Sequence, residues 1–280
     1  MDLFPTASVG LSLAAAASWG SADFSGGIAT KKANAFGVVV VAHGTGLLFM
    51  AVLALLTHDP LPGKVALLWG VVAGLSGGIG LAAFYRALAV GQMGVNAPIA
   101  AVLTALFPVM IGFREQGLPT SVQLGGFALA LVGIWLLASP PGQVERPKGL
   151  GLAIVAGLGF SGFLVSSRFA GTHSLFWPLV AARVASVLLM LTIVLATRVK
   201  WSPGRGALIY MIVAGILDSS GNALFVAATQ RGRLDVAAVL SSFYPASTVL
   251  LARFVLKERI SMLQGVGIAA ALVSVALIAR

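Results

Sequence analysis

The chain has 280 residues, of which 59% are hydrophobic and only 9% are charged, and its mean hydropathy is +1.01. A soluble domain normally carries about 25% charged residues, so this composition excludes one and indicates an integral membrane protein. The net charge of +10 does not indicate nucleic-acid binding, because the Lys and Arg residues are scattered between apolar segments, as membrane-flanking residues are. The absence of cysteine excludes disulfides and thiolate metal sites.

Ten apolar segments follow one another along the chain and are separated by short loops. They are 9–29, 35–56, 65–90, 95–113, 122–138, 149–169, 175–197, 206–229, 236–256 and 262–279. Most are about as long as a hydrocarbon core is thick, roughly 20 residues. No loop is long enough for a separate soluble domain. We therefore expect an all-α integral membrane bundle of ten transmembrane helices, with its function inside the bundle.

The two halves of the chain are similar to each other. A shift of 141 positions aligns Pro62-Gly63 with Pro203-Gly204, Gly91 with Gly232, Gln123 with Gln264 and Gly126 with Gly267. This divides the chain into a five-helix repeat at 1–139, a linker at 140–148 and a second five-helix repeat at 149–280. An odd number of spans turns the second copy over, which predicts an inverted-topology repeat around a central cavity, as in secondary transporters. An inert duplicated bundle and a channel are the alternatives.

The segment 236–256 has a proline near its middle. Pro245 cannot donate a hydrogen bond to the carbonyl of Ser241, so one backbone acceptor is freed beside Ser242 and Tyr244. Broken backbone at membrane depth is tolerated where neighbouring helices satisfy it or where it lines a wet cavity. We therefore expect this segment to line a transport path.

Two motifs resemble a known family. The run Trp19-Gly20-Ser21-Ala22-Asp23-Phe24 is similar to the opening signature of EamA-type members of the drug/metabolite transporter superfamily. So is Pro245 followed by Glu258-Arg259, Ser261, Leu263, Gln264 and Gly267. The resemblance covers the whole chain. It implies two five-helix repeats and export of amino acids, related metabolites or toxic small cations without ATP, across the bacterial cytoplasmic (inner) membrane.

Ionisable residues are few within the predicted spans, where their burial is costly enough to need a reason, and four of them are candidates for a functional role. Asp23 lies about 9 Å before the end of its span and His43 about 12 Å into the next, so the two can form a pair that carries a proton or binds a cationic group. Arg183 and Asp218 also share a depth, which predicts an ion pair. The pair either locks two helices together or lets Arg183 meet a substrate carboxylate. For Asp23, a structural role with Arg86 as partner is the alternative.

Aromatic and hydrogen-bonding residues complete the predicted cavity, since aromatic rings suit apolar groups and cations alike. The substrate-cavity candidates are Trp19, Asp23, His43, Phe84, Tyr85, Asn96, Thr104, Phe160, Phe163, Arg183, Asp218, Asn222, Ser241, Ser242 and Tyr244. Packing is the alternative for each of them.

Glycines and prolines are candidates for hinge or gating positions. They are Gly77, Gly80, Pro98, Pro108, Gly215, Gly221 and Pro245. Gly70, Gly74 and Gly78 recur every four residues, which predicts a smooth face for close helix packing.

The leading function is a secondary exporter of small metabolites, above all amino acids with aromatic ones among them, that works by alternating access. A multidrug or quaternary-cation exporter is the alternative. An enzyme is not expected, because no nucleophile with a base, no catalytic carboxylate pair and no phosphate-binding GxxxxGK[ST] loop is present. We expect no cofactor and no metal. The expected partners are a small-molecule substrate and the lipid bilayer, with the chain acting as a monomer. Its orientation and energy coupling stay open.

Overall fold

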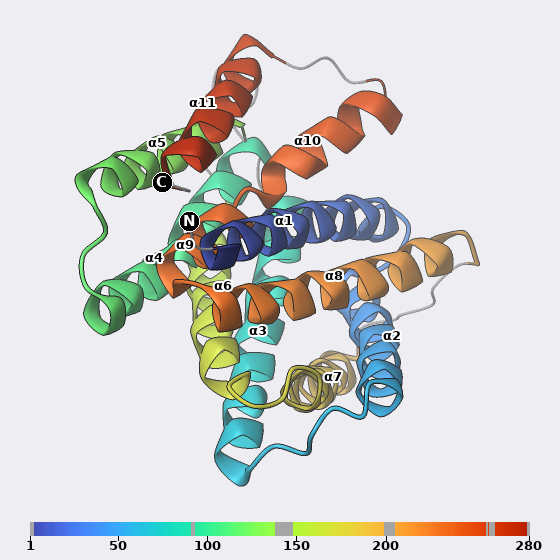
Figure 1. Ribbon diagram of the computed structural model, residues 1–280. Coiled ribbons are helices and arrows are strands. Elements are labelled where there is room, and N and C mark those ends of the chain that lie inside the picture. Colours follow the sequence, from blue (N-terminus) through green and yellow to red (C-terminus); the bar gives the residue numbers. More distant parts are fainter. Residues whose placement is uncertain are drawn as a thin grey trace.

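The computed structural model describes residues 3–90, 93–137, 148–198, 205–255, 257 and 261–278, and the regular structure of these residues is helical throughout (Figure 1). The helices are α1 (Leu3–Thr30), α2 (Ala35–Leu56), α3 (Lys64–Val90), α4 (Met93–Gln116), α5 (Ser121–Leu137), α6 (Leu150–Ala170), α7 (Trp177–Thr197), α8 (Arg205–Arg231), α9 (Leu234–Ser241), α10 (Tyr244–Val255) and α11 (Met262–Ile278). The all-α prediction is confirmed. Almost all of the predicted linker 140–148, and Glu258-Arg259, lie outside the described residues.

Seven helices or helix pairs are long and apolar enough to cross a membrane: α2, α3, α4, α6, α7, α8 and the continuous stretch Leu234–Val255. α5 and α11 are shorter apolar helices. α1 has 28 residues, which is ample length, but its second half carries more polar residues, among them Ser21 and Asp23. Each of the ten predicted segments thus corresponds to helix in this membrane protein.

The predicted span 236–256 is not one helix. α9 ends at Ser241, with Ser242 as its C-cap, and α10 begins at Tyr244, so that Pro245 lies in the first turn of a new helix. Proline is well tolerated there because the first turn leaves its N–H groups without helical partners anyway. The proline therefore marks a break rather than a kink. All eight residues of α9 are buried.

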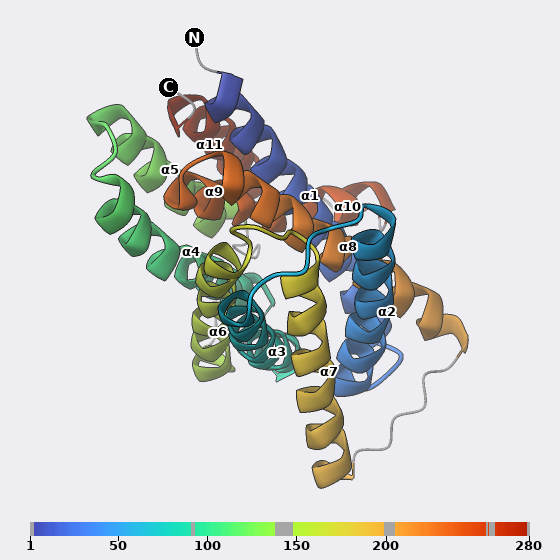
Figure 2. The same cartoon turned by 60° about the horizontal axis from the view of Figure 1, so that its bottom comes forward.

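Helices from the two halves interleave. α1 packs along α8, α3 packs along α6 and α7, α5 packs along α11, and α2 packs against α7 and α8. Figures 1 and 2 show the pair α5 and α11 at one end of the molecule and α2, α3 and α7 toward the other, with the start of α1 near the end of α11. Neither half is therefore a separate globule, and a space between the halves lies at the centre of the bundle.

Glycines make the closest helix contacts. A Cβ atom added at Gly74 would lie 2.0 Å from the carbonyl oxygen of Ala182, and one at Gly70 would lie 2.5 Å from that of Pro178. Gly78 faces Ser186 on the next turn of the same helix, α7. The predicted smooth face is confirmed, and it holds α3 against α7. Larger residues would force these backbones apart.

Candidate functional site

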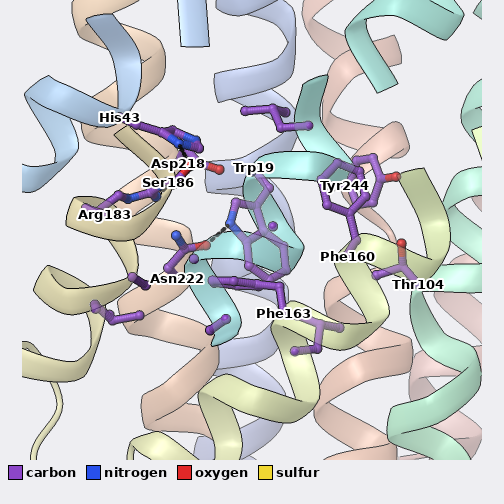
Figure 3. A pocket seen from close by; sticks show the side chains of 18 of the residues that line it. Trp19, His43, Thr104, Phe160, Phe163, Arg183, Ser186, Asp218, Asn222 and Tyr244 are labelled. Carbon is purple, nitrogen blue, oxygen red and sulfur yellow. Dashed lines mark hydrogen bonds and ion pairs between the residues drawn. The ribbon is translucent and has the colours of Figure 1, made fainter. Parts of the chain in front are cut away.

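A cavity lies between the halves and contains about 740 Å³ of empty space, counted with the part that is open to solvent. Ligand sites in proteins are concave and mostly apolar with a few polar groups, and the lining of this cavity has that character. Its walls come from α1, α2, α3, α4, α6, α7, α8 and the α9–α10 break. In Figure 3, polar side chains gather on one side and Thr104, Phe160 and Tyr244 on the other, with Trp19 and Phe163 between them. We call the two sides the polar wall (His43, Arg183, Ser186, Asp218 and Asn222) and the aromatic wall (Thr104, Phe160 and Tyr244).

The polar wall is built around an ion pair. The guanidinium of Arg183, on α7, donates a hydrogen bond to the carboxylate of Asp218, on α8, which confirms the pair predicted from their depths. The Arg183 side chain is 6% exposed and that of Asp218 is 26% exposed, so the carboxylate is the more open of the two. In a low-dielectric site each charge requires the other, because an unpaired buried charge is costly.

His43 does not pair with Asp23. Its Nδ1 atom lies 2.5 Å from the hydroxyl oxygen of Ser186, on α7, and the His43 side chain is buried. Ser186 follows Arg183 by three residues, so both side chains leave the same face of α7. Sequence reasoning missed Ser186, although its spacing from Arg183 was the available signal.

Asp23 has neither a hydrogen bond nor an ion pair within the described part of the chain. It lines the cavity and is partly exposed, whereas Arg86, the alternative partner, lies exposed at the far end of α3. The cavity lining contains two carboxyl groups and one guanidinium. One carboxylate is left over, and it faces the space where a ligand would lie.

Trp19 joins the halves at the cavity. Its indole Nε1 donates to Oδ1 of Asn222 at 2.8 Å (Figure 3), and its ring lies 5.8 Å from that of Phe225 between centroids. A Cβ atom at Gly221 would lie 2.5 Å from the Trp19 ring, so this glycine makes room for the indole. The next residue, Gly20, is equally tight: a Cβ there would lie 2.2 Å from the Tyr244 carbonyl oxygen. In the Trp-Gly pair of the signature, Trp19 therefore packs α1 against α8, and Gly20 packs it against the break between α9 and α10.

The aromatic wall carries unused hydrogen-bonding capacity. The Tyr244 hydroxyl is buried and has no hydrogen-bond partner among the described residues. The Thr104 hydroxyl donates to the Ala100 carbonyl of its own helix and can still accept a bond. Phe160 lies edge-on to Phe84, with ring centroids 5.7 Å apart. This wall offers apolar surface with two hydroxyl oxygens.

Eleven of the fifteen predicted cavity residues line this one space: Trp19, Asp23, His43, Thr104, Phe160, Phe163, Arg183, Asp218, Asn222, Ser242 and Tyr244. Phe84, Tyr85, Asn96 and Ser241 are not part of the lining. Phe84 is buried against Phe160, and Tyr85 is buried with its hydroxyl beside Gly26 of α1. Asn96 donates to the carbonyls of Ala87 and Lys148, and Ser241 donates to that of Ser12. Apart from Ser186, the lining residues that were not predicted are small or aliphatic, so their side chains have no polar or charged group that would mark them in the sequence.

The predicted hinge positions are tightly packed. A Cβ atom would lie 2.9 Å from Phe160 at Gly80, 3.0 Å from Phe163 at Gly77 and 2.2 Å from the Ala42 carbonyl at Gly215. Pro108 lies within α4, and the preceding amide, that of Phe107, donates to Ser161 of α6 at 3.1 Å. The side chain of Pro98 is outside the part of the chain that the structure describes. Packing accounts for these glycines, and movement at them stays a prediction.

Comparison with known proteins supports the same class. Residues 147–280 match the EamA-like transporter family, which covers just under half of the chain. A solved crystal structure is similar in fold, with a TM-score of 0.81 over 97% of this chain and 97% of that chain, at 17% sequence identity. No curated protein matches. The second half of this chain is therefore an EamA-like transporter domain, a domain of membrane transporters and not of enzymes.

Proposed function

We propose that the whole chain is a secondary transporter that exports small metabolites, above all amino acids with aromatic ones among them, by alternating access. The carboxyl group of Asp23, which has no partner among the described residues and lines a cavity with an aromatic wall, carries this proposal. An ammonium group would balance its charge, and aromatic rings beside it would receive an apolar or aromatic side chain.

The carboxylate end of an amino acid also has a suitable neighbour. Arg183 lines the cavity, and its guanidinium has five N–H donors, of which one is used by Asp218. A substrate carboxylate would share or replace Asp218 at this guanidinium, while the free Tyr244 hydroxyl donates from the opposite wall. Under this arrangement the substrate bridges the two walls.

The packing pattern supports a repeat of the two halves, and we propose that the repeat is inverted. α1 lies along α8 as α6 lies along α3, α2 meets α7, and α5 meets α11, so exchanging the halves exchanges equivalent contacts. Five spans in the first half would turn the second half over, and rocking of one half against the other would expose the cavity to alternate sides. We place the transporter in the bacterial cytoplasmic membrane and propose that it works as a monomer.

The alternative function, export of multidrug-type or quaternary cations, has one observation in its favour. Asp23, which has no partner among the described residues, would bind an organic cation that lacks a carboxylate, since the cavity lining has one more carboxyl group than it has guanidinium groups. The two functions differ in the role of Arg183, because an amino acid has a carboxylate for the guanidinium to bind and an organic cation has none.

Efflux from proteoliposomes tests both. Vesicles are preloaded with labelled amino acids or organic cations, with and without a pH gradient. We expect saturable amino-acid efflux that is abolished by Asp23→Asn and retained by Glu115→Gln, a matched loss of one carboxylate at an exposed position at the end of α4. Efflux of cations alone would establish the alternative. Absence of saturable efflux for every compound would refute a transport role.

A further inference from the structure

Two polar contacts join the halves at the face where α2, α4, α6 and α8 end, which we call the gate face. The first is made by Asp59, in the loop between α2 and α3. Its carboxylate accepts hydrogen bonds from the Ser174 hydroxyl at 2.7 Å and from the backbone N–H groups of Leu175, Phe176 and Trp177 at 3.2, 2.8 and 3.2 Å. One carboxylate of the first half thus holds the start of α7 in the second half.

This contact is stronger than a surface hydrogen bond. Bonds to an ionised acceptor are about twice as strong as neutral ones, and the positive end of the α7 dipole adds to them. The Trp177 indole also donates back to the Asp59 carbonyl at 3.0 Å, and Ser174 is buried. Five hydrogen bonds therefore depend on the position of Asp59 in the loop between α2 and α3.

The second contact lies between the α8–α9 turn and the end of α4. Arg233 forms a bidentate ion pair with the fully buried Asp235, at 3.0 and 2.7 Å, and donates to the carbonyls of Gln116 and Gly117 at 3.0 and 2.7 Å. Asp235 packs directly on α4, because a Cβ at Gly112 would lie 2.8 Å from it. Here a side chain of the second half, Arg233, binds backbone carbonyls of the first half. At the first contact the direction is reversed, since Asp59 of the first half binds backbone N–H groups of the second.

Further bonds place both contacts on one face. The Ser8 hydroxyl, near the start of α1, donates to the Ala228 carbonyl near the end of α8. Gln123, near the start of α5, donates to the Ile278 carbonyl at the end of α11. Each bond connects the two halves, and each lies among the ends of α2, α4, α6, α8 and α11 or the starts of α1, α3, α5, α7 and α9. Hydrogen bonds between the halves thus occur at four places on the described part of this face.

We propose that the Asp59–α7 contact and the Arg233–Asp235 grip on α4 are the gate that closes this face, and that both must break for the cavity to open there. The proposal rests on alternating access as the proposed function. It gives a transport role to Asp59, Arg233 and Asp235, which lie away from the cavity lining. Rocking of the halves separates the two members of each contact.

Cross-linking tests whether the face must open. The chain contains no cysteine, so paired cysteines need no other change. Leu61→Cys with Thr172→Cys spans the first contact, and Leu118→Cys with Arg231→Cys spans the second; all four positions are exposed. A short bis-methanethiosulfonate linker, which forms a disulfide with each cysteine and releases sulfinate, should abolish substrate efflux, and reduction of these disulfides should restore it. Export by the bridged protein at the rate of its reduced form would overturn the proposal.

Distance measurements between spin labels at the same pairs need no known substrate, so they separate a wrong gate from a wrong transport function. Asp59→Asn removes the charge that four donors share, and it should raise the ratio of open to closed gate face by about tenfold. Glu115→Gln removes one charge from the same face without breaking a bond, and it should leave the ratio unchanged. A single short distance in both variants and in the parent would contradict the gate.

Discussion

The two walls of the cavity differ in how far their polar groups are already satisfied. On the polar wall, Arg183 has Asp218 and His43 has Ser186, while Asn222 accepts from Trp19. On the aromatic wall, the Tyr244 hydroxyl has no partner among the described residues. Side chains that already have hydrogen-bond partners hold helices together without a ligand. A hydroxyl without a partner can gain a hydrogen bond only when a ligand binds. We therefore expect the polar groups of the polar wall to stabilise the empty protein, and we expect the Tyr244 hydroxyl to contribute when a substrate binds.

The largest expected effect is on the polar wall. Arg183→Met leaves the Asp218 carboxylate unpaired and should lower the free energy of unfolding by about 3–5 kcal/mol. The double variant Arg183→Met, Asp218→Leu removes both charges and should recover most of that loss. Unfolding in lipid nanodiscs measures both. If the double variant is as unstable as the single one, the ion pair is not what stabilises this wall.

Transport by the double variant then sharpens the comparison. A pair that only joins helices would leave amino-acid efflux intact once stability returns. A pair that also receives the substrate carboxylate would leave efflux abolished in a stable protein, which is the outcome that we expect.

A smaller effect is expected where α1 meets the aromatic wall. In Gly20→Ala the new methyl group would lie 2.2 Å from the Tyr244 carbonyl oxygen, a backbone atom that cannot rotate away. Such overpacking should lower the free energy of unfolding by about 1–3 kcal/mol. Gly27→Ala, on the same helix, meets nothing within 4 Å and should raise it by up to about 1 kcal/mol through helix propensity. Equal effects of the two substitutions would show that the contact with Tyr244 is unimportant.

The smallest effect on stability is expected on the aromatic wall itself. Tyr244→Phe removes a buried hydroxyl that has no partner, so the free energy of unfolding should change by less than about 1 kcal/mol. The KM for efflux should rise about tenfold, because the bound substrate loses one hydrogen bond. Tyr210→Phe, near the start of α8 and away from the lining, is the control. An unchanged KM would mean that this hydroxyl does not contact substrate.

Much of the fold could be predicted because hydropathy and capping act locally. α2 has the predicted bounds, since Asn34 accepts a hydrogen bond from the Phe36 amide and so fixes where the helix starts. The Arg183–Asp218 pair followed from helix rise alone, because two charges at one depth in a membrane seek each other.

Contacts between helices could not be predicted in this way. Counting residues gives depth but not which face a helix turns to its neighbour, so His43 was expected near Asp23 and instead meets Ser186. The Asp235 carboxylate was overlooked because it looked like part of a loop, yet it is fully buried against α4. Rotation about the helix axis and long-range pairing of loops depend on tertiary packing, which a single sequence does not encode legibly.

The break between α9 and α10 divides one predicted span into two helices with different surroundings. All residues of α9 are buried, and α9 packs against α4. In contrast, α10 carries Phe254 and Val255 on its outer surface, where they would contact lipid. When α9 releases α4 in the proposed gate, the break would let α10, twelve residues long, keep its own place at the surface. The two helices of this crossing would then move separately, so substitutions in α10 need not loosen the contact that α9 makes with α4.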